Sequence, residues 1–593
     1  MKKMICIASA FLFVHGAMAE QRPNVIILLT DDQGYGDISF HGNPIVQTPN
    51  MDRLAEQSTR FTQFFVSPLC QPTRASLMTG RNKVIGRRIE PNEQTMPQMF
   101  QRGGYATAIF GKWHLGEYYP FRPIDKGFDH QLLIGAGAIT QTQDYWGNTL
   151  FDPYLNENGD WKRFKGYCTD VLFDEAIQWM KAQNGRPFFC YLAANAAHGP
   201  FDAPDEYKRP FFKKGLKGNA AAFFGMIANL DDNLGTLRAE LNRMGIAENT
   251  LLIFMTDNGS TKKGFYNAGM RGAKASIYEG GSRAAAFFNW PGTLEEGREI
   301  DRLAMHYDLL PTFSDWFGIP MLEGDGIADL DGISLKPLLL GQKAEYPDRY
   351  HIIYQGFWPP NKPLRQYKNT SIRSQDFRLA NGDELYNLRN DPGETRNVIK
   401  DFPDKAAELK QAYDAWWESM ADELPELRVY KPYPVGDQTK IPITMCALHY
   451  YDSLVYPNAA KWFQTGFYRQ PKLKALLQDE QSPSPKKKPL LGSWKIDFKT
   501  PGTYRFTLRK GTESAPEPLT VIREGTAHVR IDGERFEQII PDDTQAVEIK
   551  VQVEKPGVRR VECWFEGQRA DGKPSGAYFV DIIRINDGAC GTF

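Results

Sequence analysis

Over the first half of the chain, short apolar runs alternate with stretches whose apolar positions recur at helical spacing. Apolar runs of this length, bounded by turn residues, are typical of strands that are buried on both faces. Strands that alternate with helices predict an α/β domain with a mostly parallel sheet between layers of helices. The predicted strands are 24–30, 105–110, 187–193 and 251–256, and the predicted helices are 48–57, 169–181, 220–244 and 306–317.

The pattern changes after this region. Between 349 and 397, shorter strand patterns and turns precede an amphipathic helix near 403–420, which predicts a small α+β subdomain. The stretch 424–489 is irregular and aromatic-rich, and its proline- and lysine-rich end is typical of a linker. From 494 onward, apolar and polar residues alternate along runs separated by turns, which predicts an added C-terminal β-sandwich.

The first residues have the composition of a secretory signal peptide. Lys2 and Lys3 precede an apolar stretch, and residues 17–19, Ala-Met-Ala, form a small-x-small cleavage site before Glu20. The apolar stretch is too short to span a bilayer, and no later apolar run is long enough. We therefore expect an exported protein, periplasmic or extracellular, with no integral membrane segment.

Charge and cysteine content narrow the class of protein. The 593 residues include 71 Lys+Arg and 72 Asp+Glu, which gives a formal net charge of -1. This balance lacks the basic excess that nucleic-acid binding requires, so we expect no nucleic-acid partner. The 7 cysteines are too few for a disulfide scaffold in a chain of this size.

Oxygen-bearing side chains follow two of the predicted strands, at the edge of a parallel sheet where ligands bind. Asp31 and Asp32 follow the first strand, and Asp257 and Asn258 follow strand 251–256. Carboxylate and amide oxygens gathered at two strand ends favour Ca²⁺ or Mg²⁺ over zinc. A turn or a helix N-cap is the structural alternative for either pair alone. The similar pair at 231–232 is not assigned to the metal, because an apolar stripe places it on a helix.

Cationic side chains follow the other two predicted strands. Lys112 and His114 come after strand 105–110, and His198 comes after strand 187–193. A lone histidine is usually structural, but two at strand ends, one of them beside a lysine, favour a functional role. A metal with several positive donors predicts a pocket for a tetrahedral oxyanion ester.

Cys70 lies at or just before the N-terminus of a predicted helix. Pro72 fits the first helical turn, where free N–H groups and the helix dipole favour an anion. Arg74, four residues on, can reach the same face and bind an oxyanion. The residues alone indicate either a thiol nucleophile of low pKa or a capped helix with a buried free thiol.

Residues 70–74, Cys-Gln-Pro-Thr-Arg, continued by Ala-Ser-Leu-Met-Thr-Gly-Arg at 75–81, resemble the signature of the type I, formylglycine-dependent sulfatases. The other elements of that family follow in its order and cover roughly residues 22 to 420. They are Asp31-Asp32, 111–114, His198-Gly199-Pro200, 257–259, 271–274, 278–283, and 384–388 with Asp391-Pro392. The resemblance implies the alkaline-phosphatase-like fold.

The resemblance also implies a cofactor and a set of roles. Cys70 would be oxidised to Cα-formylglycine (3-oxoalanine) by a formylglycine-generating or anaerobic maturing enzyme, and its hydrate would attack sulfur. His198 would protonate the leaving alcohol with help from Lys274 on a sulfate oxygen, and His114 would deprotonate the second hydroxyl. Arg74 and Lys112 would hold the hydrate and its charge. The implied ligands of Ca²⁺, with Mg²⁺ as the alternative, are Asp31, Asp32, Cys70, Asp257 and Asn258.

We therefore predict an exported sulfatase acting on a sulfated carbohydrate, a glycan or polysaccharide with sulfated galactose or N-acetylhexosamine as candidates. A phosphoester or phosphonate monoester hydrolase of the same superfamily, and a catalytically inert glycan-binding protein, remain alternatives. Candidate substrate-binding residues, which could equally pack their own loops, are Arg122, Asp144, Trp146, Trp161 and Tyr266. The predicted boundaries are 1–19 for the signal peptide, 20–345 for the catalytic α/β domain, 346–425 for the subdomain, 426–489 for the linker and 490–593 for the sandwich.

Overall fold

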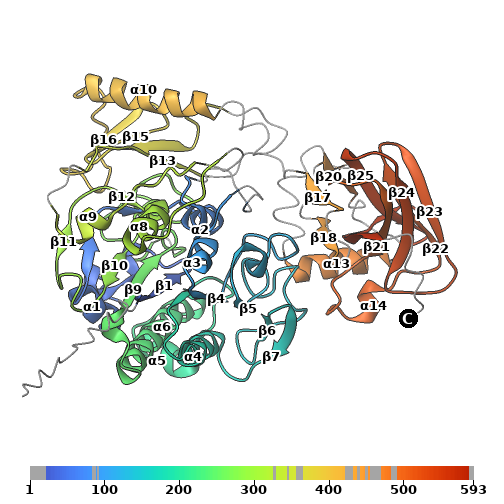
Figure 1. Ribbon diagram of the computed structural model, residues 1–593, viewed down its shortest axis with the longest axis horizontal. Helices are drawn as coiled ribbons and strands as arrows, with labels where there is room; N and C mark the ends of the chain where they lie inside the picture. Colours follow the sequence, from blue (N-terminus) through green and yellow to red (C-terminus); the bar gives the residue numbers. More distant parts are fainter. Residues whose placement is uncertain are drawn as a thin grey trace, which may run out of the picture.

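The protein is described here by a computed structural model. It covers residues 22–82, 89, 93–262, 264–324, 329–342, 346–355, 365–420, 432–436, 441–447, 452–453, 469–482 and 491–585. The predicted signal peptide lies outside the described residues, as do positions 426–431, 437–440, 448–451, 454–468 and 483–489 of the predicted linker. A large α/β body carries a small subdomain on one side, and a β-rich domain formed by the C-terminal part lies beside it (Figure 1).

The α/β body is built on a ten-stranded sheet of order β11-β2-β10-β9-β1-β8-β4-β5-β6-β7. Its centre is parallel, and every residue of the four central strands is buried. Strands covered on both faces give continuous apolar runs, so the sequence placed their ends within one residue. The central strands are β9 (Thr250–Thr256), β1 (Asn24–Thr30), β8 (Phe188–Ala193) and β4 (Ala106–Gly111).

The edges of this sheet are partly antiparallel, so the sheet is mixed but mostly parallel at its centre, as predicted. On one side lie β10 (Ala286–Asn289), β2 (Thr59–Phe61) and β11 (Glu299–Ile300). On the other lie β5 (His130–Leu133), β6 (Tyr154–Glu157) and β7 (Asp160–Arg163), and a separate pair is formed by β3 (Phe64–Phe65) and β12 (Ala304–Met305).

Helices cover both faces of the sheet and give it two cores. Ile26 and Leu28 of β1 point into one core and Val25 and Ile27 into the other, because successive side chains of a strand face opposite sides. The first core is covered by α1 (Pro49–Glu56), α4 (Cys168–Lys181), α5 (Asp205–Lys213) and α6 (Gly218–Arg243). The second is covered by α2 (Cys70–Thr79), α3 (Met96–Arg102), α8 (Leu309–Phe317) and α9 (Lys336–Leu339).

The acidic pair at 231–232 has the structural role that its place on a helix indicated. The Asp231 carboxylate of α6 accepts the backbone N–H groups of Asn50 at 3.1 Å and Met51 at 2.7 Å. These N–H groups belong to the first turn of α1, where they have no partner within the helix. Asp231 therefore caps a neighbouring helix.

The predicted α+β subdomain packs against the α/β body. A four-stranded antiparallel sheet is covered by α10 (Pro403–Ser419), and Ile372, Leu379 and Leu409 lie in their shared core. The strands are β13 (His351–Tyr354), β14 (Thr370–Arg373), β15 (Phe377–Ala380) and β16 (Glu384–Asn387).

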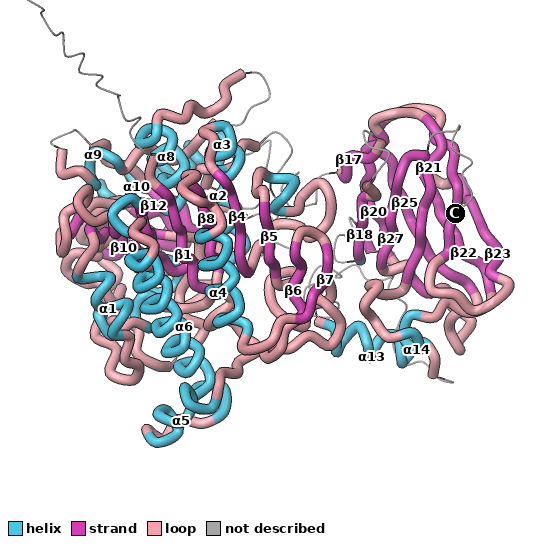
Figure 2. Tube along the Cα trace, turned by 60° about the horizontal axis from the view of Figure 1, so that its bottom comes forward, coloured by secondary structure: helices cyan, strands magenta, loops and turns pink. Residues whose placement is uncertain are grey.

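The C-terminal domain is a sandwich of two sheets around one core, as predicted. One sheet contains β17 (Tyr433–Val435), β19 (Asp452–Ser453), β20 (Gly492–Phe498), β22 (Gly525–Ile531), β23 (Glu534–Ile540), β25 (Gly557–Glu566) and β26 (Ser575–Gly576). The other contains β18 (Ile443–Cys446), β21 (Gly502–Arg509), β24 (Val547–Val553) and β27 (Phe579–Ile585). Short helices α13 (Gln470–Glu480) and α14 (Glu517–Thr520) lie beside them (Figure 2).

The structure differs from the sequence-based expectation in the stretch 426–489. Its described parts are not only a linker, because β17 and β18 pair with sandwich strands and α13 contributes Leu473 and Leu476 to the sandwich core. Strands of three and four residues are too short to show a clear alternation, so the sequence pattern did not reveal them. Among the described residues, no helix combines the length and apolarity that crossing a membrane requires.

Candidate active site

Four neighbouring strand ends bring the predicted polar residues together. Because β9, β1, β8 and β4 are adjacent and parallel, their carboxyl ends open on the same edge of the sheet. The side chains that follow these strands are Asp257 and Asn258, Asp31 and Asp32, His198, and Lys112 and His114.

Cys70 is brought to the same place by helix α2. It is the first residue of the helix, as the sequence predicted, and its Sγ lies 3.6 Å from His114 Nδ1. Asp31, Cys70 and Asp257 each offer one ligand atom, and these atoms lie within 4.8 Å of one another. A strand end, a second strand end and a helix N-terminus thus meet around one point.

Buried cations surround the two carboxylates at this point. Lys112 Nζ donates to Asp31 Oδ2 at 2.6 Å, and the Arg74 guanidinium donates to Asp257 Oδ2 at 2.9 Å. Burial alone would raise the pKa of Asp31, but Lys112, His198 and Arg74 hold that pKa well below its usual range. Burial and the charge of Asp31 raise the pKa of Asp257 to about 7, against the opposing effect of Arg74.

The oxygen atoms left over at this site fit a hard divalent cation. Asp31 Oδ1 and Asn258 Oδ1 are buried and accept no hydrogen bond from any described residue. The Asn258 amide nitrogen donates to Asp32 Oδ1 at 3.1 Å, so its oxygen remains for another ligand. Burying an oxygen atom without a hydrogen bond costs free energy, and a bound cation would offset that cost. Carboxylate and amide oxygens are the donors that Ca²⁺ and Mg²⁺ prefer.

The backbone is unusual at Asp32. This residue has a φ of 61°, in the left-handed region that non-glycine residues rarely adopt. Its N–H donates to Asp257 Oδ1 at 3.0 Å, which ties the first strand end to the second. Such conformations cost free energy and cluster at functional sites, where the surrounding structure holds them in place.

Two histidines and a lysine complete the cluster. Lys274 Nζ contacts Asp32 Oδ1, and His198 Nε2 lies 3.6 Å from Asp32 Oδ2. Burial lowers the pKa of His198, although Asp32 and Asp31 oppose this effect. Burial, with Lys112 and Arg74, lowers the pKa of His114 well below its usual range. Both imidazoles are therefore biased toward the neutral form in the free protein.

The environment of Cys70 argues against a simple thiolate nucleophile. Burial raises the pKa of the Cys70 thiol, and the nearby Lys112 and Lys274 only partly oppose this effect. A low-pKa thiol requires the reverse balance. The sequence had left a low-pKa thiol nucleophile open as one interpretation of Cys70, and the structure does not support that interpretation.

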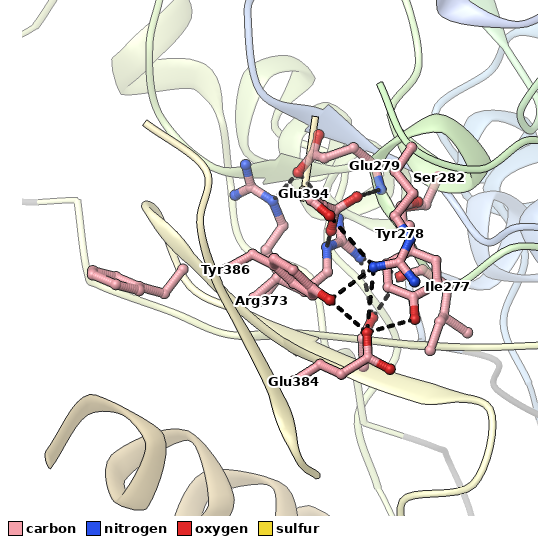
Figure 3. A network of polar contacts seen from close by, with 12 residues as sticks. Ile277, Tyr278, Glu279, Ser282, Arg373, Glu384, Tyr386 and Glu394 are labelled. Carbon is pink, nitrogen blue, oxygen red and sulfur yellow. Dashed lines mark hydrogen bonds and ion pairs between the residues drawn. The ribbon is translucent and has the colours of Figure 1, made fainter. Parts of the chain in front are cut away.

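Lys274 lies in a segment, residues 271–283, that the α+β subdomain holds in place. Figure 3 shows the polar network between the two. Arg271 donates to Tyr386 Oη at 2.8 Å, and the Glu279 carboxylate accepts Arg373 at 2.9 Å and Arg378 at 3.1 Å. These contacts cross from the subdomain sheet to the segment that carries Lys274, so the subdomain positions part of the site.

Three of the candidate substrate-binding residues have structural contacts of their own. Asp144 is buried, and its carboxylate accepts the backbone N–H groups of Gly135 at 3.1 Å and Thr140 at 2.8 Å. Trp146 packs against the core of the C-terminal sandwich. Trp161 of β7 lies against Tyr145 with ring centroids 5.9 Å apart. These contacts are with the segment itself and the neighbouring domain.

The other two candidates also make local contacts. Arg122 forms a double hydrogen bond with Asp125, at 2.9 and 2.8 Å. Tyr266 Oη donates to the backbone carbonyl of His41 at 2.7 Å. A role of these five residues in substrate binding stays a prediction.

A small cavity adjoins the cluster, and the sequence gave no signal for most of its lining. Asp31 and His198 line one part of this cavity, and apolar residues that belong to no catalytic motif line another part. The apolar part is formed by Ile134, Ala138, Ile139 and Leu150, with Asn195 beside it. Apolar residues in a loop look like ordinary core residues, so only the structure places them at the site.

Comparisons with known proteins agree with this arrangement. The sulfatase family model matches residues 23–319, and a model described as "N-sulphoglucosamine sulphohydrolase, C-terminal" matches residues 272–419. The chain is 30% identical over 400 residues to human N-acetylgalactosamine-6-sulfatase, an alignment that covers 59% of this chain and 72% of the relative. It is 28% identical over 475 residues to human arylsulfatase A, and this alignment covers 67% of this chain and 87% of the relative.

Solved structures give the same result for the fold. The crystal structure of Ps i-CgsB in complex with k-i-k-neocarrahexaose has a TM-score of 0.60 and 27% identity, and the match covers 67% of this chain and 93% of that one. The matched families end before the C-terminal sandwich begins. On the family match and the shared fold, this chain belongs to the sulfatase family of the alkaline-phosphatase-like superfamily and is a sulfuric ester hydrolase.

Proposed function

We propose that this protein is an exported enzyme that removes sulfate from a sulfated carbohydrate, with Cys70 converted to Cα-formylglycine and Ca²⁺ bound beside it. The observation that carries this proposal is the convergence of Asp31, Cys70 and Asp257 within 4.8 Å, inside a ring of buried cations. Asp31, Asp32, Asp257, Asn258 and the modified residue 70 would hold the ion.

The bound groups and the chain would divide the chemistry. Formylglycine supplies a hydroxyl nucleophile, and the divalent ion supplies positive charge to the sulfate oxygens. Lys274 would bring fixed charge to a sulfate oxygen, where charge develops as the ester bond breaks, and Lys112 would help to hold the hydrate and its charge. Arg74, held by Asp257 and by the Lys112 carbonyl at 3.0 Å, keeps its charge next to residue 70.

The two histidines lie where proton transfers are needed. His198 Nδ1 lies 2.6 Å from the Gly199 carbonyl, so it carries a proton and Nε2 faces the site. To act as a general acid, the ring would be protonated to the imidazolium, a form that Asp32 and Asp31 favour against the effect of burial on its pKa. Its Nε2 would then donate a proton to the leaving oxygen. His114 Nδ1, 3.6 Å from Cys70 Sγ, would take a proton from the side chain at position 70.

A carbohydrate substrate is supported by the relatives. Named relatives include N-acetylgalactosamine-6-sulfatase, and one of the similar structures holds a neocarrahexaose. We therefore place sulfated galactose and sulfated N-acetylhexosamine first among substrates. Export by residues 1–19, the maturing enzyme that acts on Cys70, and the domain boundaries given above belong to the same proposal.

Two measurements test the proposal. Intact-peptide mass spectrometry of active enzyme should show the peptide around position 70 as formylglycine, and an unmodified thiol in fully active protein would overturn the mechanism. His198→Ala and Lys274→Ala should each reduce sulfate release from a monosulfated sugar by at least a hundredfold. Turnover of an aryl phosphate far above that of the aryl sulfate would favour a phosphoester hydrolase instead.

A further inference from the structure

One side chain of the C-terminal part holds a loop of the α/β domain. Gln470, the first residue of α13, is buried, and its amide nitrogen lies 3.0 Å from the carbonyl oxygens of Gln141, Asp144 and Tyr145. Its amide oxygen accepts the backbone N–H of Gly147 at 2.9 Å. The Gln470 backbone N–H also donates to the Thr140 carbonyl at 3.1 Å. One glutamine thus contacts backbone groups along residues 140–147.

The same loop forms a wall of the active-site cavity. We call residues 134–150 the pocket-wall segment, because its apolar side chains line the cavity together with Asp31 and His198. Gly137 of this segment lies directly against His114. A Cβ atom at Gly137 would be 2.5 Å from His114 Nε2, while the other ring nitrogen faces Cys70 Sγ. The imidazole is therefore held between residue 70 and the pocket-wall segment.

Internal hydrogen bonds connect the two ends of this segment. Asp144, whose own backbone carbonyl contacts the Gln470 amide, accepts the N–H of Gly135 through Oδ1 and that of Thr140 through Oδ2. Gly137 N–H donates to Gln141 Oε1 at 2.7 Å. A displacement at 140–147 would therefore be passed to the residues that face the cavity.

Further contacts place the sandwich itself on this segment. The backbone N–H of Trp146 donates to Ser514 Oγ at 3.0 Å, and the Trp146 ring packs against the sandwich core. The sandwich lies on the side of the main sheet that carries β5, β6 and β7 (Figure 2). The contacts named here are thus with a loop next to the site.

We propose that the C-terminal domain is part of the substrate-binding apparatus, and that Gln470 is a positioning residue that sets the pocket-wall segment against the sugar site. Its carboxamide acts through the segment and does not touch the reacting atoms. The proposal rests on the proposed function, because it takes the cavity beside Asp31 and His198 as part of the sugar site. It assigns the sandwich a role in shaping the site, in contrast to a separate glycan-binding module.

Two substitutions separate this role from simple structural support. Gln470→Glu replaces the donor by a carboxylate facing three carbonyl oxygens, and Gln470→Met removes all side-chain hydrogen bonds at similar length. We expect both to raise the KM for a monosulfated galactose by about tenfold or more, because the wall of the binding site is displaced. A structural defect alone lowers the fraction of active molecules, and so lowers kcat while KM stays the same.

The control is Gln538→Glu, the same change at an exposed position of β23 in the same domain, for which we expect an unchanged KM. Amide hydrogen exchange gives a readout that needs no activity. Exchange within 134–150 should become at least tenfold faster in Gln470→Met, with β1 unchanged. An unchanged KM in a folded Gln470 variant, or unchanged exchange in 134–150, would overturn the inference. Wild-type protein that releases no sulfate would instead overturn the proposed function.

Discussion

The ion cluster around Glu279 offers a quantitative test of how the subdomain supports the site. Glu279→Gln keeps the shape of the side chain but removes its charge. Glu279 is 1% exposed, and its carboxylate contacts two guanidinium groups, Arg373 at 2.9 Å and Arg378 at 3.1 Å, that are equally buried. The substitution therefore leaves two buried positive charges without this partner.

Two estimates of the loss in free energy of unfolding agree in magnitude. Breaking a buried ion pair by removing one partner costs about 3–5 kcal/mol. Burial raises the pKa of Glu279, but Arg373 and Arg378 outweigh this and lower it from 4.5 to about 2. That difference corresponds to about 3 kcal/mol of stability at neutral pH. Because the folded-state pKa is the lower one, this stability is present above pH 4.5 and is lost as the pH falls toward 2.

Urea unfolding at pH 7 measures this effect. We expect the free energy of unfolding of Glu279→Gln to be about 3 kcal/mol below that of the wild type, and the difference to shrink as the pH is lowered below 4.5. Glu295→Gln is the control. The Glu295 side chain is 73% exposed, and its carboxylate lies as far as 3.9 Å from the Arg298 guanidinium. This substitution should change the free energy of unfolding by less than about 1 kcal/mol. A loss below 1 kcal/mol in Glu279→Gln would refute the reasoning.

Two further predictions concern the site itself. Removing divalent ions with a chelator should abolish sulfate release and lower the free energy of unfolding by about 2.7 kcal/mol relative to protein at one hundred times the dissociation constant of Ca²⁺. Restored Ca²⁺ should reverse both effects, and unchanged activity in a chelator would exclude a required ion. Gly137→Ala should lower kcat at least tenfold, because its Cβ would lie 2.5 Å from His114 Nε2. Wild-type kcat in this variant would show that His114 can move without consequence.

Local chemistry made much of this protein predictable. The four central strands are buried on both faces, so their positions follow from unbroken apolar runs. The polar residues after them can be recognised as site candidates because parallel strands end at the same edge of a sheet. Cys70 and Arg74 were placed by helix-start signals within a few residues of each other.

Features that depend on distant contacts were not predictable in this way. The strands β17 and β18 lie in a stretch that reads as irregular, because three or four residues carry too little periodicity to be recognised. For Trp146 the sequence left open whether the ring lines the substrate site or packs its own loop, and the structure places the ring against the sandwich core. Its aromatic ring suits either place, and only the position of the neighbouring domain distinguishes them.

The sequence by itself determined the family, the α/β core and the identity of the residues gathered at the strand ends, because these depend on short-range pattern and motif. Only the tertiary structure decided what surrounds them. It pairs Arg74 with Asp257, and it brings Arg373 of the subdomain to Glu279 in the segment that carries Lys274. It also places the Gln470 amide on the backbone of the pocket-wall segment. The partners in these contacts are separated by 183, 94 and 329 positions along the chain. No local rule of backbone or side-chain preference spans such distances, so packing alone selects them.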